Sequence, residues 1–203
     1  MNFRARPRRI CESDPNTLIG VSSSEAVAPP ATRATLTFRS VFEAEFGYVV
    51  RTLRHLGVRA NDLEDVAHDV FLHVSRHFTD YDAERPVRPW LFGFAFRVAR
   101  DFRARARHRY AFTNDFNELS DPAPGADVLL QRSQMQALAM SALNALDADE
   151  RAVFVAHELD ELSVPDLADA LEVPLNTAYS RLRRARLKFE AAARRLAVKE
   201  PNP

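Results

Sequence analysis

Apolar side chains recur every three to four residues along this chain, in one block from about 37 to 110 and a second from about 128 to 198. Such spacing places them on one face of an α-helix, whereas a half-buried strand would alternate apolar and polar residues. Neither block alternates in that way. The stretch between the blocks is polar and rich in helix breakers, among them Asn114, Asp115, Pro122, Pro124 and Gly125. The sequence therefore predicts an all-α protein with two small helical domains.

Composition sets the predicted limits of these domains. Residues 1–35 are rich in arginine, proline, serine and alanine and poor in large apolar groups, so we expect a disordered N-terminal tail. The first domain is predicted over 36–110 and the second over 133–198. The linker, 111–132, carries one arginine and four acidic residues, and we expect it to be acidic and flexible. Residues 199–203 form a predicted C-terminal tail.

The second block contains the pattern of a helix-turn-helix. Ser163 precedes Asp166 by three residues, which is typical of a helix start, and Pro165 is tolerated in a first helical turn. The predicted buried stripe of this short helix is Leu167, Ala168 and Leu171. Pro174 then ends the helix, because a proline disfavours helical backbone in the residue before it. A short turn between two helices is typical of a helix-turn-helix, whose second helix enters the DNA major groove.

The helix predicted from Leu175 onward has two chemically different faces. At 100° per residue, its apolar face consists of Ala178, Leu182, Ala185 and Phe189. Its opposite face is polar and basic and consists of Asn176, Ser180, Arg183 and Arg184. Such a helix packs one face and offers the other to an anion, although a solvated, salt-bridged surface helix has the same pattern.

Charge is unevenly distributed along the chain. Its 28 basic and 28 acidic residues sum to a formal charge of zero, which by itself gives no indication of a nucleic-acid partner. Residues 181–199, however, hold eight lysines and arginines against one acid, and residues 97–109 hold six arginines against Asp101. Because the local field steers a polyanion more than the net charge does, these two basic stripes predict two separate DNA contacts.

A long helix is predicted to begin near Pro89. Its apolar face consists of Leu91, Phe94, Ala95, Val98 and Phe102. The other face carries Phe96, Arg100, Arg103 and Arg107, with Trp90 and Arg97 at its edge. Exposed aromatic rings beside arginines suit unpaired bases, which stack on the rings while guanidinium groups hold the phosphates. In the alternative, Trp90 and Phe96 fold back against the preceding loop and only the arginines are exposed.

Another helix is predicted to open at Asn61 or Asp62, where a short polar side chain can cap it, and to run to His77. It buries an apolar stripe formed by Leu63, Val66, Ala67, Val70 and Val74. Opposite that stripe lie Asp65, His68, Leu72 and Arg76. One exposed leucine is ordinary, but a leucine flanked by Asp65 and Asp69 predicts a docking patch for a basic protein surface.

Catalysis and metal binding are not expected. The sequence contains no glycine-rich phosphate loop, nucleophile elbow or cysteine pair, so we predict a protein that is not an enzyme and has no cofactor. Asp65, Asp69, His73 and His77 follow one another at the i, i+4 spacing of metal ligands. That row drifts by 40° at each step around the helix, which spreads the four side chains too widely to close on one ion.

A cytoplasmic location is predicted. The single cysteine, Cys11, cannot form an internal disulfide, which fits a reducing compartment. No run approaches the roughly 18 consecutive apolar residues of a membrane span, so we expect no membrane insertion.

Five segments together resemble one family. They are LEDVAHDVFL at 63–72, FTDYD at 78–82, RPWLF at 88–92, RVAR at 97–100 and SRLRRAR at 180–186. Each match is weak alone, but their order and spacing, with an acidic stretch between the two halves, are similar to those of RNA polymerase sigma factors. Across roughly 38–198 the chain resembles the compact extracytoplasmic-function (ECF) type of the sigma-70 family.

The resemblance implies a transcription initiation factor that binds core RNA polymerase, recognises two promoter elements and melts DNA. The residues matching its polymerase-binding helix are Asp65, His68, Asp69 and Leu72. Those matching its minus-ten contacts are Tyr81, Arg88, Trp90, Phe96, Arg97, Arg100, Arg103 and Arg107. Those matching its minus-thirty-five contacts are Asn176, Thr177, Tyr179, Ser180, Arg181, Arg183 and Arg184. The implied partners are core polymerase, duplex and melted promoter DNA and an anti-sigma factor, with the chain a monomer when bound to polymerase.

Some positions depart from the family pattern. Histidine at 68 stands where glutamine is usual, Glu172 and Asn176 stand where glycine is common, and Ala178-Tyr179 replaces Val-Lys. Asp101 replaces an asparagine, and we expect either a changed base preference there or an ion pair with Arg97.

Two other functions stay open from the sequence. One is a helix-turn-helix repressor or activator that never joins polymerase and binds a palindrome as a dimer. The other is an adaptor whose helices bind another protein. Neither explains why a second basic helix with aromatic residues precedes an acidic linker.

Overall fold

The chain is all-helical over residues 36–110 and 127–199, which are the residues that our computed structural model describes. Side chains are described over 36–106 and 134–198. The predicted N-terminal tail, most of the predicted linker and the last four residues lie outside these ranges. In chain order the helices are α1 Phe38–His55, α2 Leu63–Arg76, α3 Val87–Tyr110, α4 Asp127–Leu143, α5 Ala148–Phe154, α6 Val164–Ala170 and α7 Leu175–Lys199.

Helix boundaries differ from the predictions at several ends. Helix α1 begins at Phe38, because Thr37 and Ser40 form a capping box that satisfies the first backbone amides. Helix α4 begins at Asp127, inside the range predicted for the linker. Helix α7 extends to Lys199, the first residue of the predicted C-terminal tail. Over the described ranges, no helix is both long and apolar enough to span a membrane.

Helices α1, α2 and α3 form the N-terminal module, which we define as residues 36–110. The stripe predicted on α2 is buried in full, from Leu63 through Val66, Ala67 and Val70 to Val74. The start of α2 differs from the prediction, because the Asp62 side chain makes no capping hydrogen bond. The chain instead enters α2 through a single 3-10 turn, Ala60–Asp62.

Helices α4 to α7 form the C-terminal module, which we define as residues 127–199. The Ser163 side chain accepts a hydrogen bond from the Asp166 amide and starts α6, as predicted. The apolar face of α7 packs inward through Ala178, Leu182 and Ala185, and the Phe189 ring stacks on that of Phe154 with centroids 4.6 Å apart. A π-helical turn, Val155–Leu159, connects α5 to the segment before α6.

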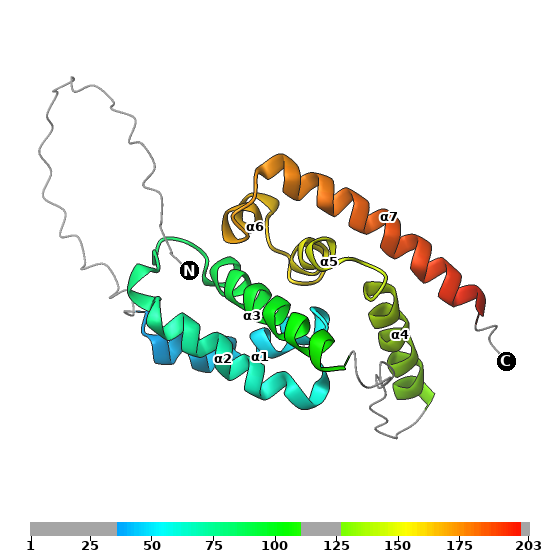
Figure 1. Cartoon of the computed structure of the whole chain (residues 1–203), viewed down its shortest axis with the longest axis horizontal. Coiled ribbons are helices and arrows are strands. Elements are labelled where there is room, and N and C mark those ends of the chain that lie inside the picture. The colour runs from blue at the N-terminus through cyan, green and yellow to red at the C-terminus, as the bar shows by residue number, and fades with distance from the viewer. Residues whose placement is uncertain (1–35, 111–126, 200–203) are drawn as a thin grey trace, which may run out of the picture. The chain divides into compact units, whose positions relative to one another are not determined.

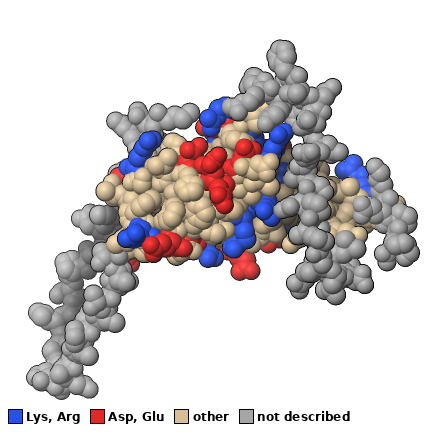
Figure 2. Space-filling view, turned by 90° about the horizontal axis from the view of Figure 1, so that it is seen from below, with Lys and Arg blue, Asp and Glu red and all other residues tan. Residues whose placement is uncertain are grey.

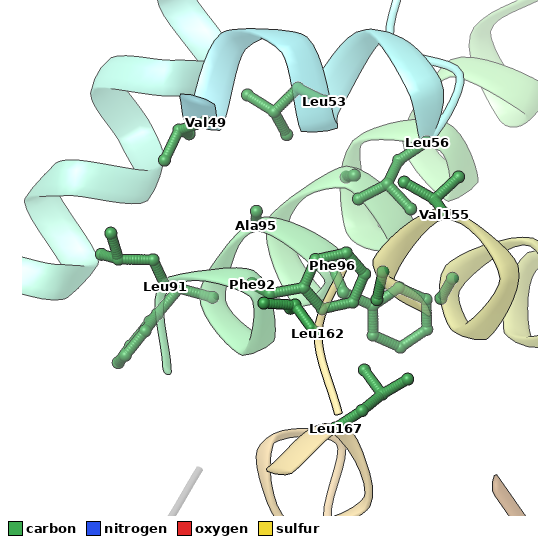
Figure 3. Packing of buried hydrophobic residues seen from close by; sticks show 14 of the residues in the cluster. Val49, Leu53, Leu56, Leu91, Phe92, Ala95, Phe96, Val155, Leu162 and Leu167 are labelled. Atoms are coloured by element: carbon green, nitrogen blue, oxygen red, sulfur yellow. The ribbon is translucent and has the colours of Figure 1, made fainter. Parts of the chain in front are cut away.

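Helix α3 is buried on every side near its start. All six residues from Leu91 to Phe96 are buried, although they cover more than one full helical turn. A helix buried all round must pack against protein on opposite sides. Helices α1 and α2 contact one side of α3, and α6 contacts another (Figure 1). Figure 3 shows the result, with Phe92 and Phe96 lying among Leu56, Val155, Leu162 and Leu167.

We predict that Leu53→Ala lowers the free energy of unfolding by about 2–5 kcal/mol, because Leu53 is fully buried and its truncation leaves a cavity. Leu72→Ala is the matched control, since Leu72 is 55% exposed on α2 and its loss should change stability by less than about 0.5 kcal/mol. Urea denaturation followed by circular dichroism measures both changes. Equal losses in the two variants would contradict this packing.

Candidate nucleic-acid interface

A tight turn sets the start of α7. The amide of Val173 donates to the Ala168 carbonyl at 3.0 Å, and that of Glu172 donates to the Asp169 carbonyl at 3.2 Å. These two bonds form a Schellman motif, which requires a left-handed residue at the helix end. Glu172 is that residue, with a φ of 57°. The family pattern has glycine here, and glutamate adopts the same backbone at a cost in strain.

The outer face of α7 is open to solvent. One shallow surface depression is lined by Asn176, Tyr179, Ser180, Arg183, Arg184 and Leu187. All six side chains are exposed, and Thr177 is half-buried beside them. The polar and basic face predicted from the sequence therefore projects away from the module. Because α7 is the second helix of a helix-turn-helix, this face is the one that can enter a major groove.

The arginines of α7 differ in their surroundings. Arg181 forms an ion pair with Asp149 at 2.6 Å, and Arg184 approaches Glu150 at 3.3 Å. The Glu150 carboxylate is only 3% exposed and also binds Lys188 at 2.6 Å, so these contacts attach α7 to α5. Among the side chains that the structure describes, Arg183 has no ionic partner. Arg183 is therefore the cation best placed to contact DNA without breaking an internal contact.

Aromatic rings gather at the start of α3. Trp90 is half-buried, with its ring centroid 4.8 Å from that of Tyr81 and 5.0 Å from that of Phe94. The Tyr81 hydroxyl donates to the Arg85 carbonyl, which holds the loop in place. Arg88 donates to Glu45 at 3.0 Å and lies over the Tyr48 ring. The alternative in which Trp90 packs against the preceding loop is therefore the arrangement observed.

Phe96 corrects one expectation. We predicted an exposed ring, but Phe96 is only 8% exposed. The reason lies in the C-terminal module, whose Val155, Leu162 and Leu167 surround this side of α3 (Figure 3). The unbroken apolar run from Leu91 to Phe96 is the sequence signal that indicates a helix covered on both sides.

The arginines predicted on α3 point in different directions. Arg97 donates to Glu172 at 3.4 Å, and Arg103 donates to the Leu56 carbonyl at 3.1 Å. Arg100 is exposed and lies over the Phe96 ring, 5.6 Å from its centroid. Asp101 lies 3.8 Å from Arg100, so the ion pair with Arg97 considered from the sequence is not the one observed. The side chain of Arg107 is outside the described residues.

The predicted docking face on α2 is continuous. Asp65, His68, Asp69 and Leu72 are all exposed on the same side of the helix. Two further residues next to this face were not predicted from the sequence. The rings of Phe42 and Phe46 lie 6.5 and 5.4 Å from the His68 ring, and both are partly buried. Phe42 and Phe46 are four residues apart on α1, and this spacing could have indicated an aromatic row at the surface.

A buried arginine connects the two modules. Arg151 on α5 donates through Nε to the His55 carbonyl and through Nη1 to the Asn144 side chain at 2.8 Å. Burial, with a smaller effect from Arg103, lowers the pKa of Arg151 to about 10. The side chain therefore stays charged near neutral pH. No periodic pattern indicates this contact, because the partner carbonyl lies almost a hundred residues away in the chain.

Basic and acidic side chains alternate over the surface. On the face drawn in Figure 2, acidic groups gather near the centre and basic groups lie around them. The positive and negative side chains of the chain thus cancel in sum but lie in separate patches on the surface. Exposed cations such as Arg183 therefore remain local sites for an anion.

Comparison with known proteins identifies both modules. The family pattern Sigma-70 region 2 matches residues 41–109, and the pattern Sigma-70, region 4 matches residues 136–189. The chain belongs to the sigma-70 family. Region 2 covers most of α1 and all of α2, together with nearly all of α3. Region 4 covers the last turns of α4 together with α5, α6 and the first half of α7.

Relatives place the chain in the ECF branch of that family. It is 29% identical over 147 residues to the RNA polymerase sigma factor NccH of Alcaligenes xylosoxydans xylosoxydans, covering 70% of this chain and 79% of the relative. It is 25% identical over 145 residues to the ECF RNA polymerase sigma-E factor of Haemophilus influenzae, covering 66% and 75%.

Solved structures agree with this assignment. CnrH in complex with the cytosolic domain of CnrY is 26% identical with a TM-score of 0.55, covering 76% of this chain and 85% of that one. RpoE of Bartonella quintana in complex with the anti-sigma factor NepR shares the fold, with a TM-score of 0.59 at 20% identity, covering 77% and 96%.

This protein is a non-catalytic ECF sigma factor for transcription initiation, which recognises promoters through regions 2 and 4. A helix-turn-helix regulator that acts without polymerase would not account for the match to region 2.

We predict that Arg183→Ala weakens holoenzyme binding at the upstream promoter element by about 1–3 kcal/mol, because Arg183 is exposed on the outer face of α7. Arg186→Ala is the control, since the Arg186 guanidinium is held by Glu158 at 2.6 Å. Competition binding on a promoter found by run-off transcription of genomic DNA measures the difference. If the two variants bind the promoter with equal affinity, Arg183 does not contact the upstream element.

Proposed function

We propose that the exposed face of α2 is the polymerase-binding surface of this sigma factor. Leu72 offers an apolar contact, and Asp65 and Asp69 flank it with negative charge. His68 lies at the edge of this face, and its ring packs against that of Phe46, which extends the face toward α1. A polymerase surface with a small apolar pocket and basic side chains around it would complement this arrangement.

The minus-ten element is assigned in this proposal to the loop before α3 and to the exposed side of α3. Tyr81 and Trp90 form an aromatic platform on which an unpaired base can stack. Arg100 is exposed and can hold a neighbouring phosphate, and the exposed Arg88 can do so once it releases Glu45. Phe96, Arg97 and Arg103 are occupied by internal contacts in this structure, so their share in DNA binding requires those contacts to change. Arg107 stays a prediction from the resemblance.

The minus-thirty-five element is assigned to the outer face of α7, and the free guanidinium of Arg183 is the single observation that carries the assignment. Around it, Asn176, Tyr179 and Ser180 offer hydrogen-bonding groups to bases and phosphates. Arg181 and Arg184 already hold Asp149 and Glu150, so we assign them mainly to positioning the helix. Thr177, half-buried at the edge, completes the proposed contacts.

The proteins bound to two solved relatives suggest a further partner for this chain. CnrH is in complex with the cytosolic domain of CnrY, and RpoE of Bartonella quintana with the anti-sigma factor NepR. We therefore include an anti-sigma factor among the proposed partners of this chain, beside core RNA polymerase and duplex and melted promoter DNA. A cytoplasmic location and a single copy per polymerase follow from the same function.

Reconstitution with core RNA polymerase tests the function directly. The purified chain is expected to elute with core polymerase and to direct run-off transcription from a discrete set of start sites in a genomic library. Failure to alter the start sites of core polymerase, together with tight binding of the chain alone to DNA, would contradict the proposal.

We predict that Leu72→Ala weakens binding to core polymerase by about 1.5–3 kcal/mol, the value of burying one leucine side chain at an interface. Val198→Ala is the control, because Val198 is 83% exposed near the end of α7, beyond the residues that match region 4. Fluorescence anisotropy with labelled factor measures both affinities. A core affinity that is unchanged in Leu72→Ala would place the docking surface elsewhere.

We predict that Trp90→Ala reduces open-complex formation on duplex promoters at least about tenfold, the value of losing roughly 1.4 kcal/mol of base stacking. A promoter that carries a premelted bubble should be transcribed nearly as well by the variant as by the wild type. Permanganate footprinting of unpaired thymines measures melting on both templates. Equal defects on the two templates would indicate that Trp90 acts on folding or polymerase binding rather than on melting.

A further inference from the structure

Four side chains of α7 form one row along its outer face. Asn176, Ser180, Arg183 and Leu187 lie within about 60° of one another around the helix, because successive residues are turned by about 100°. All four are exposed. Ser180 is short, and its hydroxyl donates to the Thr177 carbonyl at 2.9 Å. Asn176 and Arg183 are therefore the two long polar side chains of this row.

The module does not need these two side chains for its own structure. The first turn of α7 closes without the Asn176 amide group, because the backbone amides of Thr177 and Ala178 both donate to the Pro174 carbonyl, at 2.8 and 3.1 Å. Within the described ranges, the Asn176 side chain makes no hydrogen bond and Arg183 has no ionic partner. Both groups can therefore bind DNA without breaking an internal contact.

The spacing of the two side chains matches a short interval on DNA. Asn176 lies in the first turn of α7, where the second helix of a helix-turn-helix reaches base edges in the major groove. Arg183 follows it by seven residues, which is about 10 Å along the helix axis at 1.5 Å per residue. At 3.4 Å per base pair, this distance corresponds to about three base pairs.

Each side chain has the hydrogen-bonding pattern of one base. The Asn176 amide group presents one donor and one acceptor side by side, and adenine presents the matching pair, the N7 acceptor and the N6 donor. The Arg183 guanidinium presents two donors side by side, which match the N7 and O6 acceptors of guanine. Cytosine and thymine offer neither pattern in the major groove.

We infer that Asn176 reads an adenine of the minus-thirty-five element and that Arg183 reads a guanine about three base pairs away. This base readout rests on the proposed assignment of that element to α7. Tyr179 lies beside the row, where a contact to phosphate fixes the register of the helix and carries no sequence information. Glycine, which is common in the family at position 176, has no side chain to read a base, so the adenine contact is particular to this chain.

A randomised promoter tests the readout. The upstream element of a promoter found by run-off transcription is replaced by all sequences, and the DNA bound by holoenzyme with the full-length chain is isolated and sequenced. For the wild type we expect one position that prefers adenine and a second, about three base pairs away, that prefers guanine. Each preference over the other bases should be about 5- to 150-fold, the value of one bidentate contact.

Asn176→Asp is the sharpest variant, because it keeps the shape of the side chain and replaces its donor by an acceptor. A carboxylate accepts from cytosine N4 but cannot donate to adenine N7, so the preference at this one position should change from adenine to cytosine. Folding is not at risk, since an acidic side chain in the first turn of a helix is stabilised by the helix dipole. Asn176→Gln, which keeps both the donor and the acceptor, should still prefer adenine.

Arg183→Ala tests the second contact in the same library. This variant should lose the guanine preference and keep the adenine preference, because the two side chains read different base pairs. Arg186→Ala is the control on the same helix, since Glu158 holds the Arg186 guanidinium at 2.6 Å. Both preferences should be unchanged in the control.

The outcomes separate the base readout from the assignment of the element to α7. A preference that stays the same at every position in Asn176→Asp would overturn the adenine contact. A uniform loss of affinity in Arg183→Ala, with the guanine preference kept, would overturn the guanine contact but leave α7 on the upstream element. If neither variant changes affinity or preference there, both the readout and the assignment of α7 to that element are wrong.

Discussion

The packing of α3 on two opposite sides is the constraint on which the rest of the structure depends. Its start, Leu91 to Phe96, has no polar position, so no side of it can face water without a loss of hydrophobic stabilisation. Helices α1 and α2 cover one side, which makes the N-terminal module. The other side is covered by α6 and the π-helical turn. Two modules that match separate family patterns therefore share one core.

Electrostatics explains how a chain with no net charge can bind a polyanion. Acidic residues of the C-terminal module hold specific arginines: Asp149 and Glu150 bind the inner arginines of α7, while Asp169 and Glu172 bind those of region 2. The first pair holds α7 against α5, and the second pair lies against the segment that we propose for the minus-ten element. What is left exposed, above all Arg183 and Arg100, is a small set of cations whose effect is local.

Sequence periodicity was enough to predict the helix faces. The buried stripe of α2 and the inner face of α7 follow from residues three and four apart, so local spacing determines them. Phe96, Arg151 and Glu172 could not be placed in that way, because each meets a partner from the other module, 75 residues away in the case of Glu172 and Arg97. The exposed side of α2 that we propose as a docking face was predictable from spacing, but the adjoining Phe42 and Phe46 were not, because they contact His68 from a neighbouring helix.

We propose that the two reading helices, α3 and α7, depend on polymerase for their spacing. DNase footprinting of one promoter with the chain alone, with core polymerase alone and with both tests this most directly. We expect protection of the minus-ten and minus-thirty-five elements only when the chain and core polymerase are both present. Full protection of the upstream element by the chain alone would contradict the account, because a single module with one small interface could not produce it.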